Sequence, residues 1–205
     1  RQRDRNAVVT GLRIVGPLEP GAPSSFQRRM DGWMREGGLR TGTARAARRL
    51  LERCWCRPIP SEEAHRVADL VRDAAMSGAD PDRRPGRPAA VALQQALVIY
   101  AITSPEFLYR IERSRAEDRL AEDGTEPLDG HAIAGRLGAF LRGGLPDERL
   151  LEAARQGRLD EEEGVRREVR RLLRGEAPRS LAERFAVQWL HVDGVERLDP
   201  DPGRY

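Results

Sequence analysis

The fold class of this chain is decided by one stretch, TARAARRLLERCW at residues 43–55. Its apolar side chains recur at the spacing of one helical face, and its charged side chains, Glu52 among them, occupy the other side. The apolar positions are Ala47, Leu50, Leu51, Cys54 and Trp55. Pro58 and Pro60 predict the end of this helix, because the helical conformation is disfavoured before a proline. The stretch therefore predicts an amphipathic helix that contributes one stripe to a core.

Comparable patterns predict further helices between residues 61 and 190. Most begin with a Ser, Asp or Ser-Pro signal, since a side-chain oxygen at a helix start can accept from free backbone N–H groups. We expect caps at Ser61, Ser104, Asp129 and Ser180, with Pro105 and Pro146 in the first turn. Residues 89–103, apolar nearly all round, are expected to form the central helix. The expected buried residues are Val67, Leu70, Val71, Ala74, Ala75, Phe107, Leu108, Ile111, Ile133, Leu137, Phe140, Leu141, Leu150, Leu151, Ala154, Leu181, Phe185 and Trp189.

The first 40 residues have a different pattern. A β-branched run at residues 8–15 ends in Gly-Pro and predicts one short strand, and the turn-forming residues behind it predict an irregular connector. A lone strand needs partners, so we expect its sheet to lie upstream. The chain starts at Arg1 and ends in a loop-like composition, so we interpret it as a piece of a larger protein.

The predicted fold class is mainly α: an irregular bundle of about seven to eight helices with a short N-terminal β-strand and connector. The expected domain organisation is the end of an upstream β domain with its connector at 1–40, a small helical domain at 41–113, a linker at 114–127, and a second helical domain, truncated at its C-terminal end, at 128–205.

Composition narrows the function classes. The chain has 205 residues, and all 36 of its basic residues are arginine, offset by 33 acids to a net charge of +3. The longest apolar stretch, residues 89–102, is too short to span a bilayer, so no transmembrane segment is expected. No signal-peptide pattern is visible. Motifs of phosphate-binding loops, dinucleotide-binding folds, zinc proteases and serine hydrolases are absent from the sequence.

The cysteines and histidines offer few candidates for chemistry. Cys54 and Cys56 are too few for a disulfide framework or a zinc site, so we interpret both as ordinary buried or half-buried side chains, with a redox or intermolecular role as the alternative. Of the histidines His65, His131 and His191, the last stands two residues before Asp193, which could orient an imidazole for base catalysis. No nucleophile accompanies that pair. We assign no catalytic, cofactor-binding or metal-binding residue.

The arginines raise the question of nucleic-acid binding. Residues 28–57 contain nine arginines against three acids, and a basic helix followed by a second helix is typical of helix-turn-helix proteins. The second predicted helix begins with acids, however, and the turn contains two prolines where a short glycine turn is usual. Arginine in place of every lysine also indicates GC-rich coding. Nucleic acid is therefore not an expected partner.

A set of motifs in the second half carries a family resemblance. They are Ser104-Pro-Glu-Phe-Leu-Tyr-Arg110, Leu128-Asp129, Ala134-Gly-Arg-Leu137 with Phe140-Leu141, Leu145-Pro-Asp-Glu-Arg-Leu-Leu151 with Ala154, Gly157 and Leu159, and Phe185-Ala-Val-Gln-Trp-Leu190. In this order they resemble the planctomycete-type domains of unknown function found in large cytochrome c-associated surface proteins, also in myxobacteria. The helix pair around Arg57-Pro58 and Glu62-Glu63 resembles the small helical domain that precedes them, and the 8–15 strand resembles the tail of their upstream β-sandwich.

The resemblance covers roughly residues 40–205, with two departures. The family has an Arg-Ala-aromatic-Arg-Arg-Pro run where this chain has Arg53-Cys-Trp-Cys-Arg57-Pro58, and it has aromatics near the positions of Ala139 and Arg142. The family supplies no established catalytic residues to carry over.

The resemblance implies an exported parent protein, periplasmic or on the cell surface, with c-type haem in other domains and no cofactor in this chain. The leading hypothesis is a non-catalytic helical scaffold or interaction module, with neighbouring domains of the same polypeptide and a redox partner as its contacts. The alternative is part of a composite oxidoreductase active site, for which Arg110, Arg136, His191 and Asp193 are the polar residues to inspect. Nucleic-acid binding through the arginine-rich helix is third. Whether the parent is an enzyme stays open.

Overall fold

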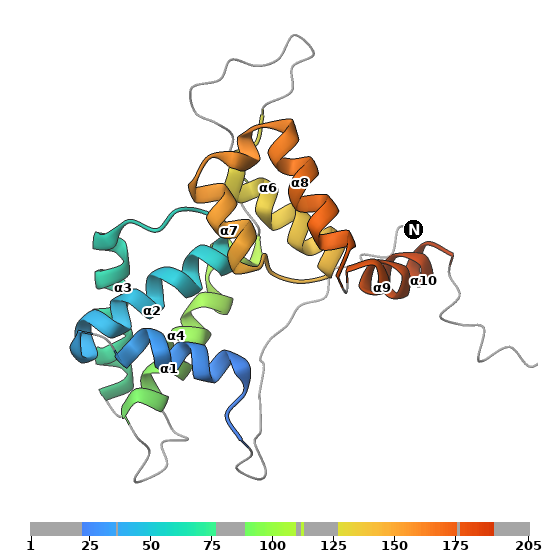
Figure 1. The fold of residues 1–205 in the computed structure, drawn as a ribbon. Coiled ribbons are helices and arrows are strands. Elements are labelled where there is room, and N and C mark those ends of the chain that lie inside the picture. The colour runs from blue at the N-terminus through green and yellow to red at the C-terminus, as the bar shows by residue number, and fades with distance from the viewer. Residues whose placement is uncertain are drawn as a thin grey trace, which may run out of the picture.

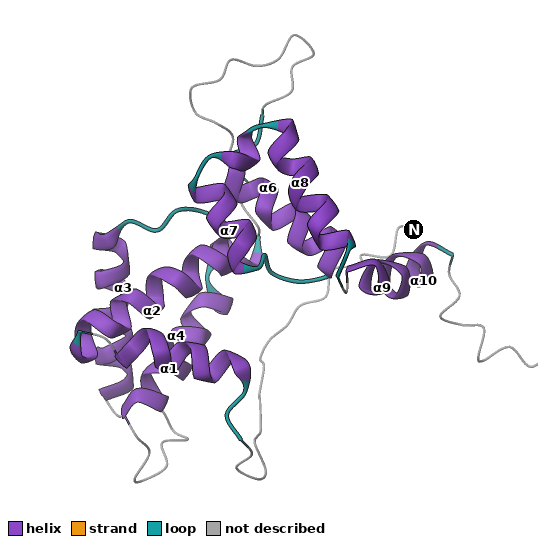
Figure 2. Ribbon diagram, in the orientation of Figure 1, coloured by secondary structure: helices purple, strands orange, loops and turns teal. Residues whose placement is uncertain are grey.

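The computed structural model describes residues 22–35, 37–76, 89–109, 112, 127–175 and 177–190. These residues are mainly α-helical and contain no strand (Figures 1 and 2). The elements are α1 (Ser25–Arg35), α2 (Gly38–Trp55), α3 (Ser61–Met76), α4 (Ala89–Thr103), α5 (Pro105–Leu108), α6 (Gly130–Leu137), the π-helix η1 (Gly138–Arg142), α7 (Glu148–Arg155), the 3-10 turn η2 (Arg158–Asp160), α8 (Glu162–Leu173), α9 (Ala177–Leu181), the π-helix η3 (Ala182–Ala186) and α10 (Val187–Trp189). The predicted strand at 8–15 lies outside the described residues.

Helix α2 is the centre of the first core, with α1, α3 and α4 around it (Figure 1). It buries the predicted stripe, Leu50, Leu51 and Trp55 included, and also small residues on a second face. At Gly42 a Cβ atom would lie 2.1 Å from the carbonyl oxygen of Met34, so only glycine allows α1 and α2 to approach this closely. Because α2 buries residues on two faces, it lies between α1, α3 and α4.

The expectation that residues 89–103 form the central helix is wrong. They do form α4, but α4 buries only Leu93, Gln94, Leu97 and Ala101, and Ile99 is 59% exposed. Among the described elements, α2 and α3 both pack against one side of α4. Apolar residues on the far side therefore stay exposed, which all-round hydrophobicity could not predict.

Helix α1 corrects a second expectation, since it lies where an irregular connector was predicted. Its start is a reciprocal cap: Ser24 N–H donates to Oε1 of Gln27 at 2.7 Å, and Gln27 N–H donates to Oγ of Ser24 at 3.1 Å. Met30 and Met34, one turn apart, are then buried against the first core. The Ser-x-x-Gln signal was present in the sequence but lay among turn-forming residues.

The second core is formed by α6, α7, α8 and η2 around Leu150, Leu159 and Leu172. Asp129 caps α6 as predicted, accepting from the backbone N–H of Ala132 at 2.7 Å. Helix α7 begins at Glu148, two residues later than predicted from Pro146. Asp147 is the cap and accepts from Leu150 N–H at 2.9 Å, and Pro146 precedes the cap and is fully buried. Separate apolar clusters are consistent with two helical domains, whose exact boundaries stay a prediction.

Some predicted caps and buried residues are wrong for local reasons. Ser104 precedes α5, but its hydroxyl donates backwards to the carbonyl of Ala101 at 2.8 Å and makes no cap bond. Ser180 lies inside α9, which begins at Ala177. Leu70 and Leu108 are 54% and 63% exposed, since the packing faces of α3 and α5 are rotated away from them.

The largest correction concerns the aromatic residues of the second half. Phe140, Phe185 and Trp189, predicted as core residues, are 59%, 49% and 69% exposed. Two of them lie within π-helical segments and Trp189 follows one, and the wider π-helical turn shifts each side chain off the stripe that α-helical spacing predicts. Their rings instead contact one another in the order Phe140–Phe185–Trp189, with centroids 6.1 Å apart at each step. With Leu190, 57% exposed, they form what we call the aromatic face.

Candidate functional site

A buried carboxylate connects the first core to the second. Glu52 lies on α2, and its side chain is only 7% exposed. Its Oε1 lies 3.2 Å from Nε2 of His131 on α6 and accepts from Nε of Arg155 on α7 at 2.8 Å. Its Oε2 accepts from Nη2 of Arg155 at 3.0 Å. We call these three residues the ionic bridge.

The electrostatics of the ionic bridge keep Glu52 charged. Burial alone would raise the pKa of this carboxyl, but the hydrogen bonds from His131 and Arg155 outweigh it and lower the pKa to about 2. Arg155 is held in turn by Glu148 at 2.9 Å and by Glu152 at 2.6 Å, and its pKa is raised, first by its hydrogen bond to Glu52. With both oxygens of Glu52 occupied by donors, this carboxylate is suited to holding helices together and unsuited to accepting a proton near pH 7.

The lowered pKa of Glu52 predicts an acid-dependent loss of stability. The pKa of an unfolded glutamate is near 4.5 and that of Glu52 in the folded chain is about 2, so the contribution of the bridge is complete above pH 4.5 and is lost as the pH falls toward 2. We expect the difference in unfolding free energy between the native chain and Glu52→Gln to shrink over that window. Denaturant titrations at several pH values measure it. A difference that stays constant from pH 5 to pH 2 would contradict the assignment.

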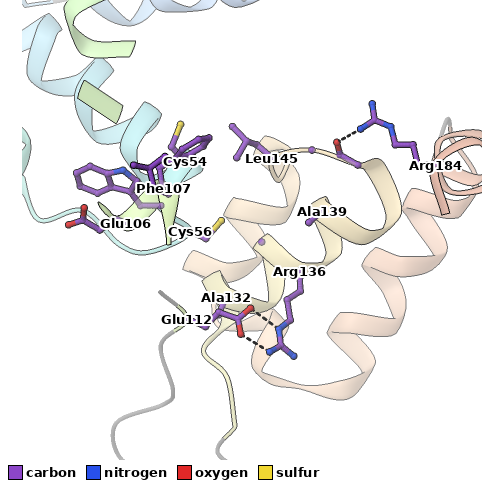
Figure 3. Close-up of a pocket in the computed structure, with 15 residues that line it drawn as sticks. Cys54, Cys56, Glu106, Phe107, Glu112, Ala132, Arg136, Ala139, Leu145 and Arg184 are labelled. Carbon is purple, nitrogen blue, oxygen red and sulfur yellow. Dashed lines mark hydrogen bonds and ion pairs between the residues drawn. The ribbon is translucent and has the colours of Figure 1, made fainter. Parts of the chain in front are cut away.

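A cleft of about 690 Å³ is lined by residues from both cores (Figure 3). Trp55, Cys56 and Phe107 line one side, and Gly135 and Leu145 line the other. The walls are thus mainly apolar, and the charged side chains at the edge are already bound to protein atoms.

Two arginines mark the polar edge of the cleft. Arg136 donates to both oxygens of Glu112, at 2.8 and 2.6 Å, and Arg184 donates to the carbonyl of Gly143 at 2.7 Å. Arg136, 60% exposed, is the one residue of the predicted oxidoreductase set within the described chain; Arg110, His191 and Asp193 lie outside it. The structure therefore places one member of that set in a cleft and does not test whether the four share it.

The cysteines have the burial that the sequence predicts. Cys54 is buried and Cys56 half-buried, and neither is in a disulfide. Burial raises the pKa of the Cys54 thiol to about 11. Cys56 ends α2 in a left-handed conformation, φ 49°, and its Sγ lies only 2.7 Å from where a Cβ of residue 135 would be, so glycine is needed there. A redox or intermolecular role for the pair stays a prediction.

Burial and pKa together predict selective alkylation. At pH 8 iodoacetamide should modify Cys56 well before Cys54, because the Cys54 thiol is covered and remains protonated. Mass spectrometry of the peptides at successive times measures both rates. The Cys56→Ser variant should lose the fast phase and keep the slow one; faster labelling of Cys54 would contradict the packing at the end of α2.

The other histidine within the described residues, His65, contacts the backbone of its own helix. Nδ1 of exposed His65 lies 2.7 Å from the carbonyl oxygen of Ser61, one turn earlier on α3. Among the described residues, no group of three or more His, Cys, Asp or Glu side chains is arranged to hold a metal ion. In the same part of the chain, no helix is long and apolar enough to cross a membrane.

Sequence reasoning missed the ionic bridge. Glu52 was assigned to the charged side of its helix, and His131 and Arg155 lie 79 and 103 residues away along the chain. Nothing in the sequence joins these positions, because α7 covers the charged side of α2 only in the folded chain (Figure 1).

The C-terminal part of the chain is similar to one known family model. Residues 128–205 match the model of PSD4, a protein of unknown function (DUF1592). The match covers the elements α6–α10 and so includes the second core and the aromatic face. It confirms the resemblance to a domain of unknown function over these residues; the resemblance of residues 40–127 to a preceding domain stays a prediction. No curated protein and no solved structure matches the chain.

Proposed function

We propose that this chain is a non-catalytic helical scaffold that holds two helical units in a fixed arrangement within a larger protein. The ionic bridge carries this proposal. A carboxylate that is almost fully buried between two cores, and bonded to both of its partners, resists separation of those cores because Arg155 would lose its counter-charge and His131 its hydrogen-bond partner. Residues Arg49 and Glu148, 4.0 Å apart, add a second, weaker contact between α2 and α7.

The other polar clusters support the same proposal, since they stabilise helices. Arg57, 11% exposed, donates to both oxygens of Glu63 and lies 4.8 Å from the centroid of the Trp55 ring. Arg171 binds both oxygens of Asp147, the cap of α7. These arginines join the ends of one helix to the next, which is what a rigid module requires.

The wider context of the proposal rests on the resemblance alone. An exported, cytochrome-associated parent would use this module as a spacer between its neighbouring domains, with the haem located in those domains. The complete coding sequence that contains residues 1–205 is expected to encode an export signal and a Cys-x-x-Cys-His site. A coding sequence lacking both would contradict this part of the proposal and leave the scaffold itself untouched.

Distances measured between the two cores test the scaffold proposal. Labels introduced at the exposed positions Arg66 on α3 and Arg166 on α8, by an unnatural amino acid that spares both cysteines, report the separation of the two cores. We expect a narrow distribution in the native chain and a broadened one in Glu52→Ala, because the bridge is lost. The matched control is Glu152→Ala, which removes an exposed partner of Arg155 and should leave the distribution narrow. A broad distribution in the native chain would overturn the proposal.

The cleft favours a second candidate function. It is lined by both cores and has an Arg136–Glu112 pair and the Cys56 thiol at its walls, so a neighbouring haem domain could complete a composite oxidoreductase site there. In the parent protein, Arg136→Leu would then shift the midpoint potential of that haem, since a nearby positive charge favours the reduced state. An unchanged potential would remove this candidate.

Nucleic-acid binding through the arginine-rich helix is the third candidate, and the side-chain bonding weakens it. In the 28–57 segment Arg40 binds Asp69, Arg49 lies over the Trp33 ring, and Arg57 binds Glu63. These side chains would have to leave protein partners to reach phosphates. Steeply salt-dependent retention of the chain on DNA would nevertheless favour this candidate over the scaffold.

A further inference from the structure

Arg53 is a half-buried arginine of α2 whose side chain has no hydrogen-bond or ion-pair partner among the described residues. Its Nε atom is buried and unbonded. Nε of Arg57 has no partner either, but both terminal nitrogens of that side chain bind Glu63. A guanidinium that has lost part of its hydration and has no acceptor in the protein is destabilising unless a ligand supplies the acceptor.

Two more arginines lie near Arg53, one from each core. Arg29 is exposed on α1, which packs against α2, and Arg142 is the last residue of η1. Cys54, which follows Arg53, and Leu145, three residues after Arg142, line the same cleft, and Leu145 also packs against the first core (Figure 3). Burial lowers the pKa of Arg53, and the charges of Arg29 and Arg142 lower it further. We call Arg29, Arg53 and Arg142 the arginine cluster.

The two acids beside the arginine cluster are bound to other arginines. Asp147 lies 3.7 Å from Arg142, but both of its oxygens accept from Arg171, at 3.0 and 3.1 Å. Glu148, whose charge also reaches the cluster, accepts from Arg155 at 2.9 Å. The members of the cluster on α1 and α2 are therefore without a bound counter-charge in the part of the chain that the structure describes.

A doubly charged phosphate group suits this arrangement. Its oxygens can accept from several guanidinium groups at once, whereas a carboxylate offers two oxygens and a single charge. We propose that the arginine cluster binds one dianionic phosphate group, free or as the monoester of a small molecule, which joins Arg29 and Arg53 of the first core to Arg142 of the second. This site goes beyond the scaffold proposal and uses no residue of the ionic bridge, so each can fail without the other.

Calorimetric titration of the full chain with inorganic phosphate tests the site, at pH 8 and at an ionic strength held constant with sodium chloride. We expect one phosphate per chain. Arg53→Met and Arg142→Met should each weaken binding by about tenfold or more, because each removes charged donors. Arg66→Met, which removes an exposed arginine of α3, is the matched control and should bind as the native chain does. No binding to the native chain, or equal binding to both cluster variants, would overturn the proposal.

A parallel titration with glycerol 1-phosphate distinguishes the two sources of the group. Weaker binding of this monoester than of inorganic phosphate would support a site for free phosphate. Equal or tighter binding of the monoester would support a site for a phosphorylated small molecule. The same three variants apply, and the effect of Arg53→Met should be the same for both ligands.

Thermal unfolding separates an anion site from an arginine that only holds the fold. In phosphate-free chloride buffer Arg53→Met should be at least as stable as the native chain, since the apolar stem is kept and an unpaired, partly buried charge is removed. Phosphate should raise the Tm of the native chain and of Arg66→Met, and leave that of Arg53→Met unchanged. A clear loss of stability of Arg53→Met in the phosphate-free buffer, or an equal rise of its Tm with phosphate, would overturn the proposal.

Discussion

Glu52→Ala is expected to lower the free energy of unfolding by about 3 kcal/mol, because it removes the hydrogen-bond partner of buried His131 and the counter-charge of Arg155. His131 is 6% exposed and so loses its partner in a largely dry environment; Arg155, whose side chain is 31% exposed, regains part of its hydration. Chemical denaturation followed by circular dichroism measures the loss.

The control is Glu152→Ala, which removes another carboxylate bonded to the same arginine. Its side chain is 47% exposed, so water replaces it and the stability should change far less. Glu52→Gln separates charge from hydrogen bonding, because the amide keeps one acceptor oxygen but carries no charge. The decrease in unfolding free energy for Glu52→Gln should therefore lie between the decreases for Glu52→Ala and Glu152→Ala. If Glu52→Ala and Glu152→Ala cost the same, the two helical cores would not be joined through Glu52.

Gly164→Ala is the second large effect and acts through backbone geometry alone. A Cβ at this position of α8 would lie 1.6 Å from the carbonyl oxygen of Arg158, so η2 and α8 would have to separate. Because the obstacle is backbone and cannot rotate away, we expect a loss of about 3 kcal/mol or more. Thermal or chemical unfolding of the purified variant measures it.

Gly32→Ala in α1 is the matched control, since the same methyl group there meets no atom within 4 Å. Alanine is the better helix former, so this variant should be more stable than the native chain by about 0.5–1 kcal/mol. The change in unfolding free energy should therefore have opposite signs for Gly→Ala in α1 and in α8, which tests the packing of α8 directly. A neutral Gly164→Ala would show that η2 does not lie against α8.

Both predictions concern how neighbouring elements are held together, and this is what the scaffold proposal requires. The cleft exists because α5 and the end of α2 on one side face α6 and η1 on the other. Loosening the ionic bridge would therefore change the shape of the cleft as well as the stability. A composite site with a neighbouring domain would be affected through the same residues.

Much of the helical order follows from local sequence signals. The periodicity of residues 43–55 predicts α2, Asp129 caps α6 where the sequence places it, and Pro105 occupies the first turn of α5. These features depend on side chains within one or two turns of each other. Helix α1 belongs to the same class, since its Ser24–Gln27 cap is local and readable, although turn-forming neighbours conceal it.

For several aromatic and charged residues, the burial in the structure is the opposite of what α-helical spacing predicts. Phe140 and Trp189 lie at positions that α-helical spacing assigns to the core, yet π-helical turns rotate them into solvent. Glu52 lies at a position that the same spacing assigns to solvent, yet α7 covers it. For Glu52 the decisive contact comes from a helix about 100 residues away in the chain, whereas for the two aromatic residues the π-helical turn itself is decisive.

The sequence by itself determined that the described chain is helical, where most helices begin, and that residues 128–205 match the model of a domain of unknown function, because these depend on residue order and local hydrogen bonding. Only the tertiary structure decided that α2 is central, that Glu52 is a buried bridge, and that the aromatic face is exposed. Burial depends on which helices meet and at what rotation. One helix's periodicity contains no information about the partner that will cover it.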